Sequence, residues 1–157
     1  MDKAAIYIET SVVSYLVALP SRDIIVAAHQ QLTVDWWENQ RQQYDLFVSQ
    51  IVLDEARAGD QQAAENRMAA LENVPLLEIN EAVIGLAENL VQLHAVPMKA
   101  AQDALHIAVA CINGMDYLLT WNCKHIANAK MRSKIEQVCQ ESGYIAPIIC
   151  TPEELED

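Results

Sequence analysis

The sequence predicts an α/β fold in which a central parallel sheet is covered by helices on both faces. Short apolar runs alternate with longer segments that have the three- and four-residue spacing of amphipathic helices. Parallel neighbours in a sheet need crossover connections, and the intervening helices supply them. A chain of 157 residues, 52% of them hydrophobic, suits one hydrophobic core. We therefore expect residues 1–157 to form a single domain.

Five short apolar runs have the length and composition of buried strands. Each is about four residues long and is bounded by polar or turn-forming residues, and a proline precedes the third run. The predicted strands are residues 5–8, 46–49, 76–79, 117–120 and 146–149.

The first helices are predicted from capping residues and apolar spacing. Thr10 and Ser11 carry hydroxyls suited to capping a helix directly after the first strand. Apolar residues then recur at helical spacing from Asp23 to Trp36, and a third helix passes through Glu55 after the second strand. A fourth helix spans residues 64–71.

The second half of the chain predicts three more helices. Asn80 suits the cap of a helix whose apolar face runs over residues 83–93. A nearly all-apolar helix is expected from Lys99 up to Gly114, as in a helix packed deep in a domain. Residues 128–143 complete the pattern, with Asn at the start and Gly at the end.

Charge limits the partners that the molecule can have. The sequence has 22 Asp and Glu against 10 Lys and Arg, for a formal net charge of −12. This charge repels phosphate and argues against a general nucleic-acid coat protein. Any contact with RNA or DNA must therefore be local or assisted by a cation.

The cysteines and the N-terminus indicate a cytoplasmic protein. Four cysteines have neither the paired spacing of a zinc site nor the density of a secreted disulfide scaffold, so we expect reduced thiols. The first residues lack the apolar length of a signal peptide, and no stretch approaches the roughly 20 apolar residues of a membrane helix. We expect no association with a membrane.

Polar side chains follow three of the predicted strands. Ligands of open α/β sheets bind beyond the carboxyl ends of the strands, where Glu9, Glu55 and Asn122 are expected. Asp103 adds a carboxylate to an otherwise apolar helix. Each acid alone also suits a solvated helix surface or the N-terminal end of a helix dipole. As a group without Cys or His partners they favour a hard cation, Mg²⁺ or Mn²⁺.

Other reactive side chains give weaker signals. His106, three residues after Asp103, is expected to make an internal hydrogen bond, and His125 is expected to face solvent. Cys123 lies too close to His125 in sequence for a nucleophile and its base. The sequence has no Gly-rich phosphate loop, no nucleophile elbow and no HExxH helix, which excludes those enzyme classes. Of the adjacent tryptophans at 36 and 37, at least one is expected to leave the core.

Three segments resemble successive motifs of one family. IYIETSVVSYL, VLDEARAGD and AQDALHIAVACINGMDYLLTWNCKHIAN are similar to motifs of the PIN-domain ribonucleases, in particular the VapC-like toxin branch. The similarity extends over residues 5–149. It implies a PIN-like three-layer fold with a central parallel sheet flanked by helices, and a metal-dependent endoribonuclease activity.

The resemblance also implies the roles of individual residues. Glu9 stands at the family's first Asp, Glu55 and Asp103 match the second and third acids, and Asn122 replaces a frequent fourth Asp. Glu9 keeps the charge with an added methylene, whereas Asn122 loses a charge, so weaker binding of a second metal ion is expected. Three further polar residues match family positions that would orient carboxylates or waters: Thr10, Ser11 and Thr120. Asp116 begins its strand and is expected at the far end of the sheet.

The resulting hypothesis is hydrolysis of RNA phosphodiester bonds by Mg²⁺ or Mn²⁺ held by Glu9, Glu55, Asp103 and Asn122. Four basic residues without an intervening acid would hold the phosphate backbone, or would simply form a solvated helix surface: Lys124, Lys130, Arg132 and Lys134. The resemblance further implies a toxin–antitoxin pair, an antitoxin partner and a homodimer. Two alternatives stay open, a catalytically weakened PIN-like binding or scaffold module and a metal-dependent nuclease or phosphatase acting on DNA.

Overall fold

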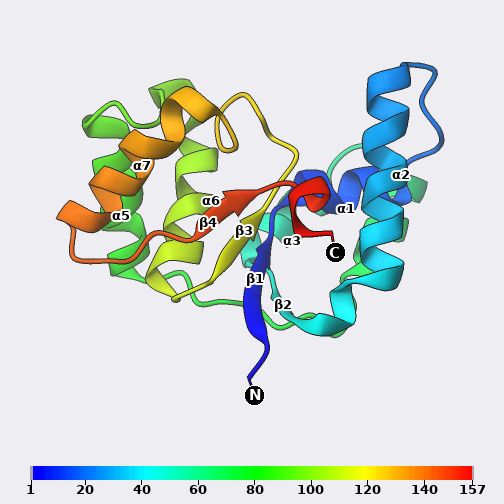
Figure 1. Cartoon of the computed structure of the whole chain (residues 1–157), viewed down its shortest axis with the longest axis horizontal. Helices are drawn as coiled ribbons and strands as arrows, with labels where there is room; N and C mark the ends of the chain where they lie inside the picture. The colour runs from blue at the N-terminus through cyan, green and yellow to red at the C-terminus, as the bar shows by residue number, and fades with distance from the viewer. Residues whose placement is uncertain (1, 157) are drawn as a thin grey trace.

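The computed structural model describes residues 2–156 and contains a four-stranded parallel sheet between two layers of helices (Figure 1). The strands lie in the order β2, β1, β3, β4, and β1 is paired on both sides, with Ile6 opposite Leu46 and Tyr117. The strand bounds are β1 (Ala4–Ile8), β2 (Tyr44–Phe47), β3 (Tyr117–Leu119) and β4 (Ile148–Cys150). The predicted three-layer α/β fold is confirmed.

The helices separate into two groups, one on each side of the sheet (Figure 1). The first group packs around α1 and the second around the pair formed by α5 and α6. The α-helices are α1 (Thr10–Val17), α2 (Ile24–Asn39), α3 (Gln50–Ala56), α4 (Gln61–Ala70), α5 (Glu81–Gln92), α6 (Ala101–Ile112) and α7 (Ala129–Glu141). Short 3₁₀ turns are η1 (Arg41–Gln43), η2 (Met98–Ala100) and η3 (Pro152–Leu155).

Side-chain caps fix the start of four helices. The side chains of Asp23, Asp60, Asn80 and Asn128 each accept a hydrogen bond from a backbone N–H in the first turn that follows. Such a cap stabilises a helix by about 1 kcal/mol. Three of these starts were predicted. The predicted capping of α1 by Thr10 and Ser11 is wrong, because both hydroxyls bind carboxylates instead.

The predicted strand at residues 76–79 is also wrong. Only one isolated bridge forms there, between Val48 and Leu76, and the backbone N–H of Leu77 donates to Val48 O at 2.7 Å. Leu76 is about half exposed, and the segment turns into the α5 cap at Asn80 only a few residues later. The apolar run is therefore too short to continue beside β2 as an edge strand.

The core fills the space between the sheet and both helical layers. The buried residues are Ile6–Ile8 in β1, Leu118 and Leu119 in β3, and Ala104 and His106–Cys111 in α6. Trp36 is fully buried, whereas Trp37 is partly exposed under the guanidinium of Arg41, 4.3 Å from the ring centroid. Trp37 still packs against the core, so the expectation that at least one tryptophan leaves the core is not confirmed.

All four cysteines are free thiols, and three of them are buried. Burial, with a contribution from the nearby Glu154 charge, raises the pKa of Cys150 to about 12, so this thiol stays protonated at neutral pH. Between residues 2 and 156, none of the helices has both the length and the apolar character needed to traverse a bilayer.

Candidate metal centre

Acidic side chains from distant parts of the chain meet at the carboxyl edge of the sheet. Glu9 lies between β1 and α1, Glu55 lies near the end of α3, and Asp103 lies in the first turn of α6. Ligand atoms of Glu9, Glu55 and His106 all lie within 4.8 Å of one another. The parallel order of the strands explains this convergence, because each acid follows the carboxyl end of a strand or opens a neighbouring helix.

Glu9 is held by two hydroxyl groups. Its Oε1 accepts hydrogen bonds from Ser11 Oγ and from Thr120 Oγ1, the latter at 2.6 Å. Ser11 Oγ in turn accepts the backbone N–H of Trp121 at 2.8 Å, which ties α1 to the segment after β3. Glu9 is only 6% exposed. Within residues 2–156 its Oε2 has no hydrogen-bond donor, so one oxygen is oriented and the other is available to a ligand.

Glu55 shows the same arrangement. Its Oε1 accepts from Thr10 Oγ1 at 2.5 Å and from His106 Nε2 at 2.7 Å. Burial by itself raises the pKa of Glu55, but the hydrogen bond and charge of His106 and the Thr10 hydroxyl outweigh it, and the pKa is lowered. Glu55 is therefore a carboxylate at neutral pH, and its Oε2 has no donor in the described chain.

His106 connects Glu55 to a buried chain of hydrogen bonds. The ring is fully buried, and its Nδ1 is 2.7 Å from the Tyr7 hydroxyl, which is 2.8 Å from Ser49 Oγ. Burial raises the pKa of Tyr7 far above its usual value, so the phenol keeps its proton. Because both ring nitrogens of His106 have partners, we assign this residue to positioning Glu55, although Nε2 lies within reach of the acids.

Sequence reasoning predicted an internal hydrogen bond for His106 but missed the chain through Tyr7 and Ser49. The three-residue spacing from Asp103 places His106 on the same helix face, which is a usable signal. Tyr7, in contrast, stands in an apolar strand, and its partners lie 42 and 99 residues away in sequence. Its role becomes visible only in the folded chain.

Asp103 lies beside this cluster and bonds to Asn122. Burial, the largest cause, raises the pKa of Asp103, while the charge of His106 and the side-chain hydrogen bond from Asn122 act in the opposite direction. The amide nitrogen of Asn122 is the donor in this bond, because a carboxylate only accepts hydrogen bonds. The Oδ1 of Asn122 accepts the backbone N–H of His125 at 3.1 Å. Asn122 thus contacts Asp103 directly and has one lone pair of its oxygen already engaged.

The expectation that His125 faces solvent is wrong. The side chain is only partly exposed, its Nδ1 is buried without a hydrogen-bond partner in the described chain, and its charge acts on Asp103. The turn in which Asn122 accepts the N–H of His125 folds this residue back toward the acids.

Asp116 lies at the opposite end of the sheet, as predicted, where its Oδ2 accepts from Ala5 N at 2.8 Å.

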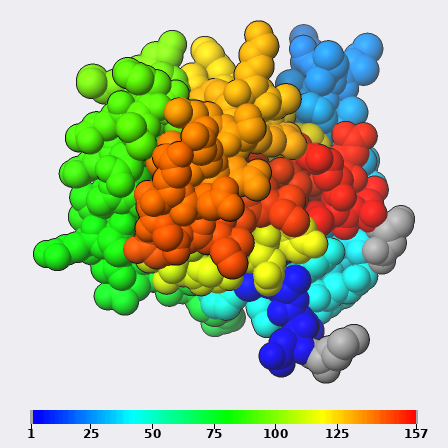
Figure 2. Space-filling view, turned by 60° about the vertical axis from the view of Figure 1, so that its left-hand side comes forward, coloured from blue at the N-terminus to red at the C-terminus, as the bar shows by residue number. Residues whose placement is uncertain are grey.

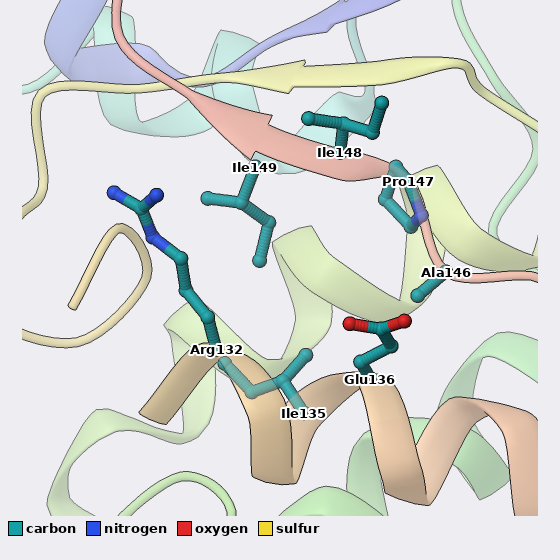
Figure 3. A pocket seen from close by; sticks show the side chains of 7 residues that line it. All are labelled: Arg132, Ile135, Glu136, Ala146, Pro147, Ile148 and Ile149. Atoms are coloured by element: carbon teal, nitrogen blue, oxygen red, sulfur yellow. The ribbon is translucent and has the colours of Figure 1, made fainter. Parts of the chain in front are cut away.

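The predicted basic residues divide into two groups. Lys124, Lys130 and Lys134 are exposed, whereas Arg132 is half-buried. A guanidinium nitrogen of Arg132 donates to Ala127 O at 3.1 Å, and another lies 4.0 Å from a Glu154 carboxylate oxygen. Arg132 lines a pocket between α7 and β4 (Figure 3), and none of the residues that line this pocket belongs to the acid cluster. This arginine is therefore partly neutralised by the C-terminal segment, which lies beside α7 on the molecular surface (Figure 2).

The donor set fits a hard divalent cation. Within residues 2–156, Glu9 and Glu55 each present one oxygen without a hydrogen-bond donor. Asp103 is not among the residues whose ligand atoms lie within 4.8 Å of one another, but it is near enough for the charge of Glu55 to raise its pKa. Carboxylate oxygens are the ligands that Mg²⁺ and Mn²⁺ prefer. No thiolate lies in the cluster, so a zinc–cysteine site does not fit these residues.

Comparison with known proteins supports the fold but assigns the sequence to no family. No family model and no curated protein matches this sequence. A chain in the solved structure of FitAB bound to an IR36 DNA fragment is similar, with a TM-score of 0.58 and 15% sequence identity. The similarity covers 97% of this chain and 98% of the other. The chain therefore has a PIN-like α/β fold over its full length.

Proposed function

We propose that this protein is a Mg²⁺- or Mn²⁺-dependent endoribonuclease. The observation that carries the proposal is the meeting of Glu9, directly after β1, and Glu55, in the helix after β2, with ligand atoms within 4.8 Å. One oxygen of Glu9 is oriented by two hydroxyl groups and one oxygen of Glu55 by a hydroxyl and the His106 ring, and within residues 2–156 the other oxygen of each has no donor. The resemblance of the sequence motifs to PIN-domain ribonucleases and the PIN-like fold support the same assignment.

In this mechanism Glu9, Glu55 and Asp103, with help from Asn122, would hold the cation. When bound, the divalent ion activates water and neutralises charge that develops on the phosphate. Thr10, Ser11 and Thr120 orient the two glutamates, His106 holds Glu55, and Asn122 holds Asp103. Held by these residues, a cation would supply the local positive charge that an RNA phosphate needs in order to approach a chain of net charge −12.

We also propose the biological context that the motif resemblance implies. The protein would be the toxin of a toxin–antitoxin pair in the cytoplasm, would bind an antitoxin protein and would form a homodimer. The exposed Lys124, Lys130 and Lys134 would contact the RNA backbone, with Arg132 contributing less because Glu154 is near it.

The experiment is incubation of the purified protein with structured RNA and single-stranded DNA, in Mn²⁺, in Mg²⁺ and in chelator. We expect RNA cleavage that requires the metal. Loss of a residue that only supports a metal ligand reduces activity roughly 10–100-fold, and we expect Asp103→Asn to reduce the cleavage rate by more than that. Asp54→Asn is the matched control, because Asp54 is an exposed acid next to Glu55 in sequence. Full cleavage by Asp103→Asn, or cleavage in chelator, would contradict the proposal.

One observation favours a second candidate, a binding or scaffold module with weakened catalysis. Asn122 stands where the resemblance implies an acid, and its oxygen already accepts a backbone N–H. In the same experiment a scaffold would show no cleavage under any condition, while cleavage of DNA in preference to RNA would indicate a DNA nuclease.

A further inference from the structure

Three aromatic rings from separate elements stack beside the acid cluster. The rings of His29 and Trp121 are nearly parallel, 13° apart, with centroids at 4.1 Å. Tyr15 lies against both, with its ring centroid 6.4 Å from His29 and 6.1 Å from Trp121 and tilts of 25° and 27°. Offset stacking of this kind gives a rigid aromatic surface. We refer to these three residues as the aromatic stack.

The aromatic stack is joined to the acid cluster through the backbone. Trp121 directly follows Thr120, whose hydroxyl binds Glu9, and the Trp121 N–H donates to Ser11, which also binds Glu9. Tyr15 lies one helical turn beyond Ser11 on the same face of α1. A nucleotide with its phosphate at the acids would therefore have its base near these rings.

The inner ring of the stack is fixed, and the outer rings have unused polar groups. Trp121 is 7% exposed, and its Nε1 donates to Thr33 Oγ1 at 2.7 Å. Thr33 Oγ1 donates to His29 O at 2.6 Å, which fixes α2 against the same ring. Tyr15 and His29 are partly exposed, and within residues 2–156 neither the phenol oxygen nor the imidazole nitrogens have a hydrogen-bond partner.

Because the molecule is acidic, an uncharged contact can add affinity for RNA that attraction between charges does not supply. With 22 acidic and 10 basic residues, attraction for phosphate supplies little affinity away from the cation. Stacking of a base on an aromatic side chain contributes about 1–3 kcal/mol per base and does not depend on attraction between charges. Only an unpaired, splayed base can use such a surface, because a paired base is already stacked within its helix.

We propose that Tyr15 and His29, supported by Trp121, form a stacking platform for an unpaired base of the RNA next to the phosphate at the acid cluster. This inference rests on the proposed function and deepens it, because it assigns the single-stranded character of the substrate to named side chains. Their free hydroxyl and ring nitrogens would contact the edge or sugar of that nucleotide.

The test is RNA binding by protein that carries Asp103→Asn to prevent cleavage, with a labelled single-stranded RNA, the same RNA as a duplex, and a series with one abasic position. We expect His29→Ala and Tyr15→Ala to raise the Kd for single-stranded RNA roughly 5–150-fold, the equivalent of one stacked base. His29→Phe and Tyr15→Phe should stay within about threefold, because the rings are kept. One abasic position should weaken binding as much as His29→Ala, without a further loss when both are combined.

His94→Ala, a change of an exposed histidine at the end of α5, is the matched control, and a melting curve for each variant reports whether it folds. Equal affinities of the alanine and parent proteins, equal binding of duplex and single strand, or no RNA binding at all would overturn the platform. Cleavage by protein with an intact Asp103 is scored separately. RNA cleavage that is unchanged in His29→Ala and Tyr15→Ala would support the nuclease proposal and contradict the platform. RNA binding that depends on these rings, without cleavage, would support the platform and contradict the nuclease proposal.

Discussion

Hydroxyl groups decide how the two glutamates are presented. A glutamate has one more rotatable bond than an aspartate, and fixing it costs conformational entropy. Thr10, Ser11 and Thr120 donate to one oxygen of each glutamate, and in the described part of the chain the second oxygen has no donor. The longer side chain at position 9 is therefore held in one orientation, which compensates for the loss of the aspartate that the resemblance implies.

The hydrogen bonds of His106 give the first prediction at the residue scale. His106→Ala removes one of the two partners of Glu55 Oε1, keeps Thr10, and leaves the Tyr7 hydroxyl with Ser49. We expect the Mn²⁺ concentration for half-maximal RNA cleavage to rise roughly 10–100-fold, with a smaller change in the rate at saturating metal. The measurement is cleavage rate against Mn²⁺ concentration, with His94→Ala as the surface control. A change confined to the saturated rate would show that His106 does not position a metal ligand.

Asp103 gives a prediction about stability. Burial raises its pKa, so the charged form costs stability in the folded metal-free protein once the pH exceeds that raised value. Below the unfolded pKa of about 3.9 both states bind the proton and this cost is absent. Asp103→Asn should therefore raise the Tm of metal-free protein at pH 7 by a few degrees, and this gain should shrink as the pH falls toward 4. Thermal melts in chelator across this range test the sign, and a lower Tm at pH 7 would refute it.

Residue types were more predictable than their partners. The acids at positions 9, 55 and 103 stood out because they follow strands or interrupt an apolar helix. Hydrogen bonds between residues more than 40 positions apart, such as Tyr7 with Ser49 and Thr120 with Glu9, depend on the register of β1 against its neighbours. The local sequence does not specify that register. The side chains that position the glutamates and His106 could therefore be identified only from the structure.

At the scale of elements, the capping residues explain where the helices start. The side chain of Asn128 accepts from the N–H of Lys130 at 2.9 Å, at the start of α7. Asn128→Ala should lower the free energy of unfolding by about 1 kcal/mol and leave metal affinity unchanged, because within residues 2–156 the Asn128 side chain bonds to backbone atoms of Lys130 and Lys124 and to none of the acids. Denaturant unfolding measures the first effect. Asn66→Ala within α4 is the control, and it should be neutral or slightly stabilising because Ala has the higher helix propensity. A loss in Asn66→Ala equal to that in Asn128→Ala would contradict the cap.

Element types were predicted well where caps and periodicity agreed, and less well at the sheet edge. The strand predicted at residues 76–79 has the apolar composition of a strand, yet it makes a single bridge to Val48. Whether a short apolar run pairs depends on the space beside the edge strand and on the distance to the next helix cap. Neither quantity is encoded in the run itself.

At the scale of the whole molecule, the fold concentrates acids at one edge of the sheet in a chain that is acidic throughout. This arrangement is unfavourable without a cation, because neighbouring carboxylates repel one another and repel phosphate. If the proposed nuclease activity holds, attraction of the substrate to a chain of net charge −12 would depend mainly on the ion and on uncharged contacts such as the aromatic stack. The one group of basic residues is weakened by the contact between Arg132 and Glu154.

The central claim is that three carboxylates from separate stretches of the chain bind one shared divalent ion. Calorimetric titration of Mn²⁺ into metal-free protein tests it most directly, with Glu9→Gln, Glu55→Gln and Asp103→Asn compared with Asp54→Asn. We predict that each of the three variants loses at least about tenfold in affinity, while Asp54→Asn binds like the parent protein. Mn²⁺ affinity that is unchanged in the three variants, or lowered equally in all four, would contradict the claim.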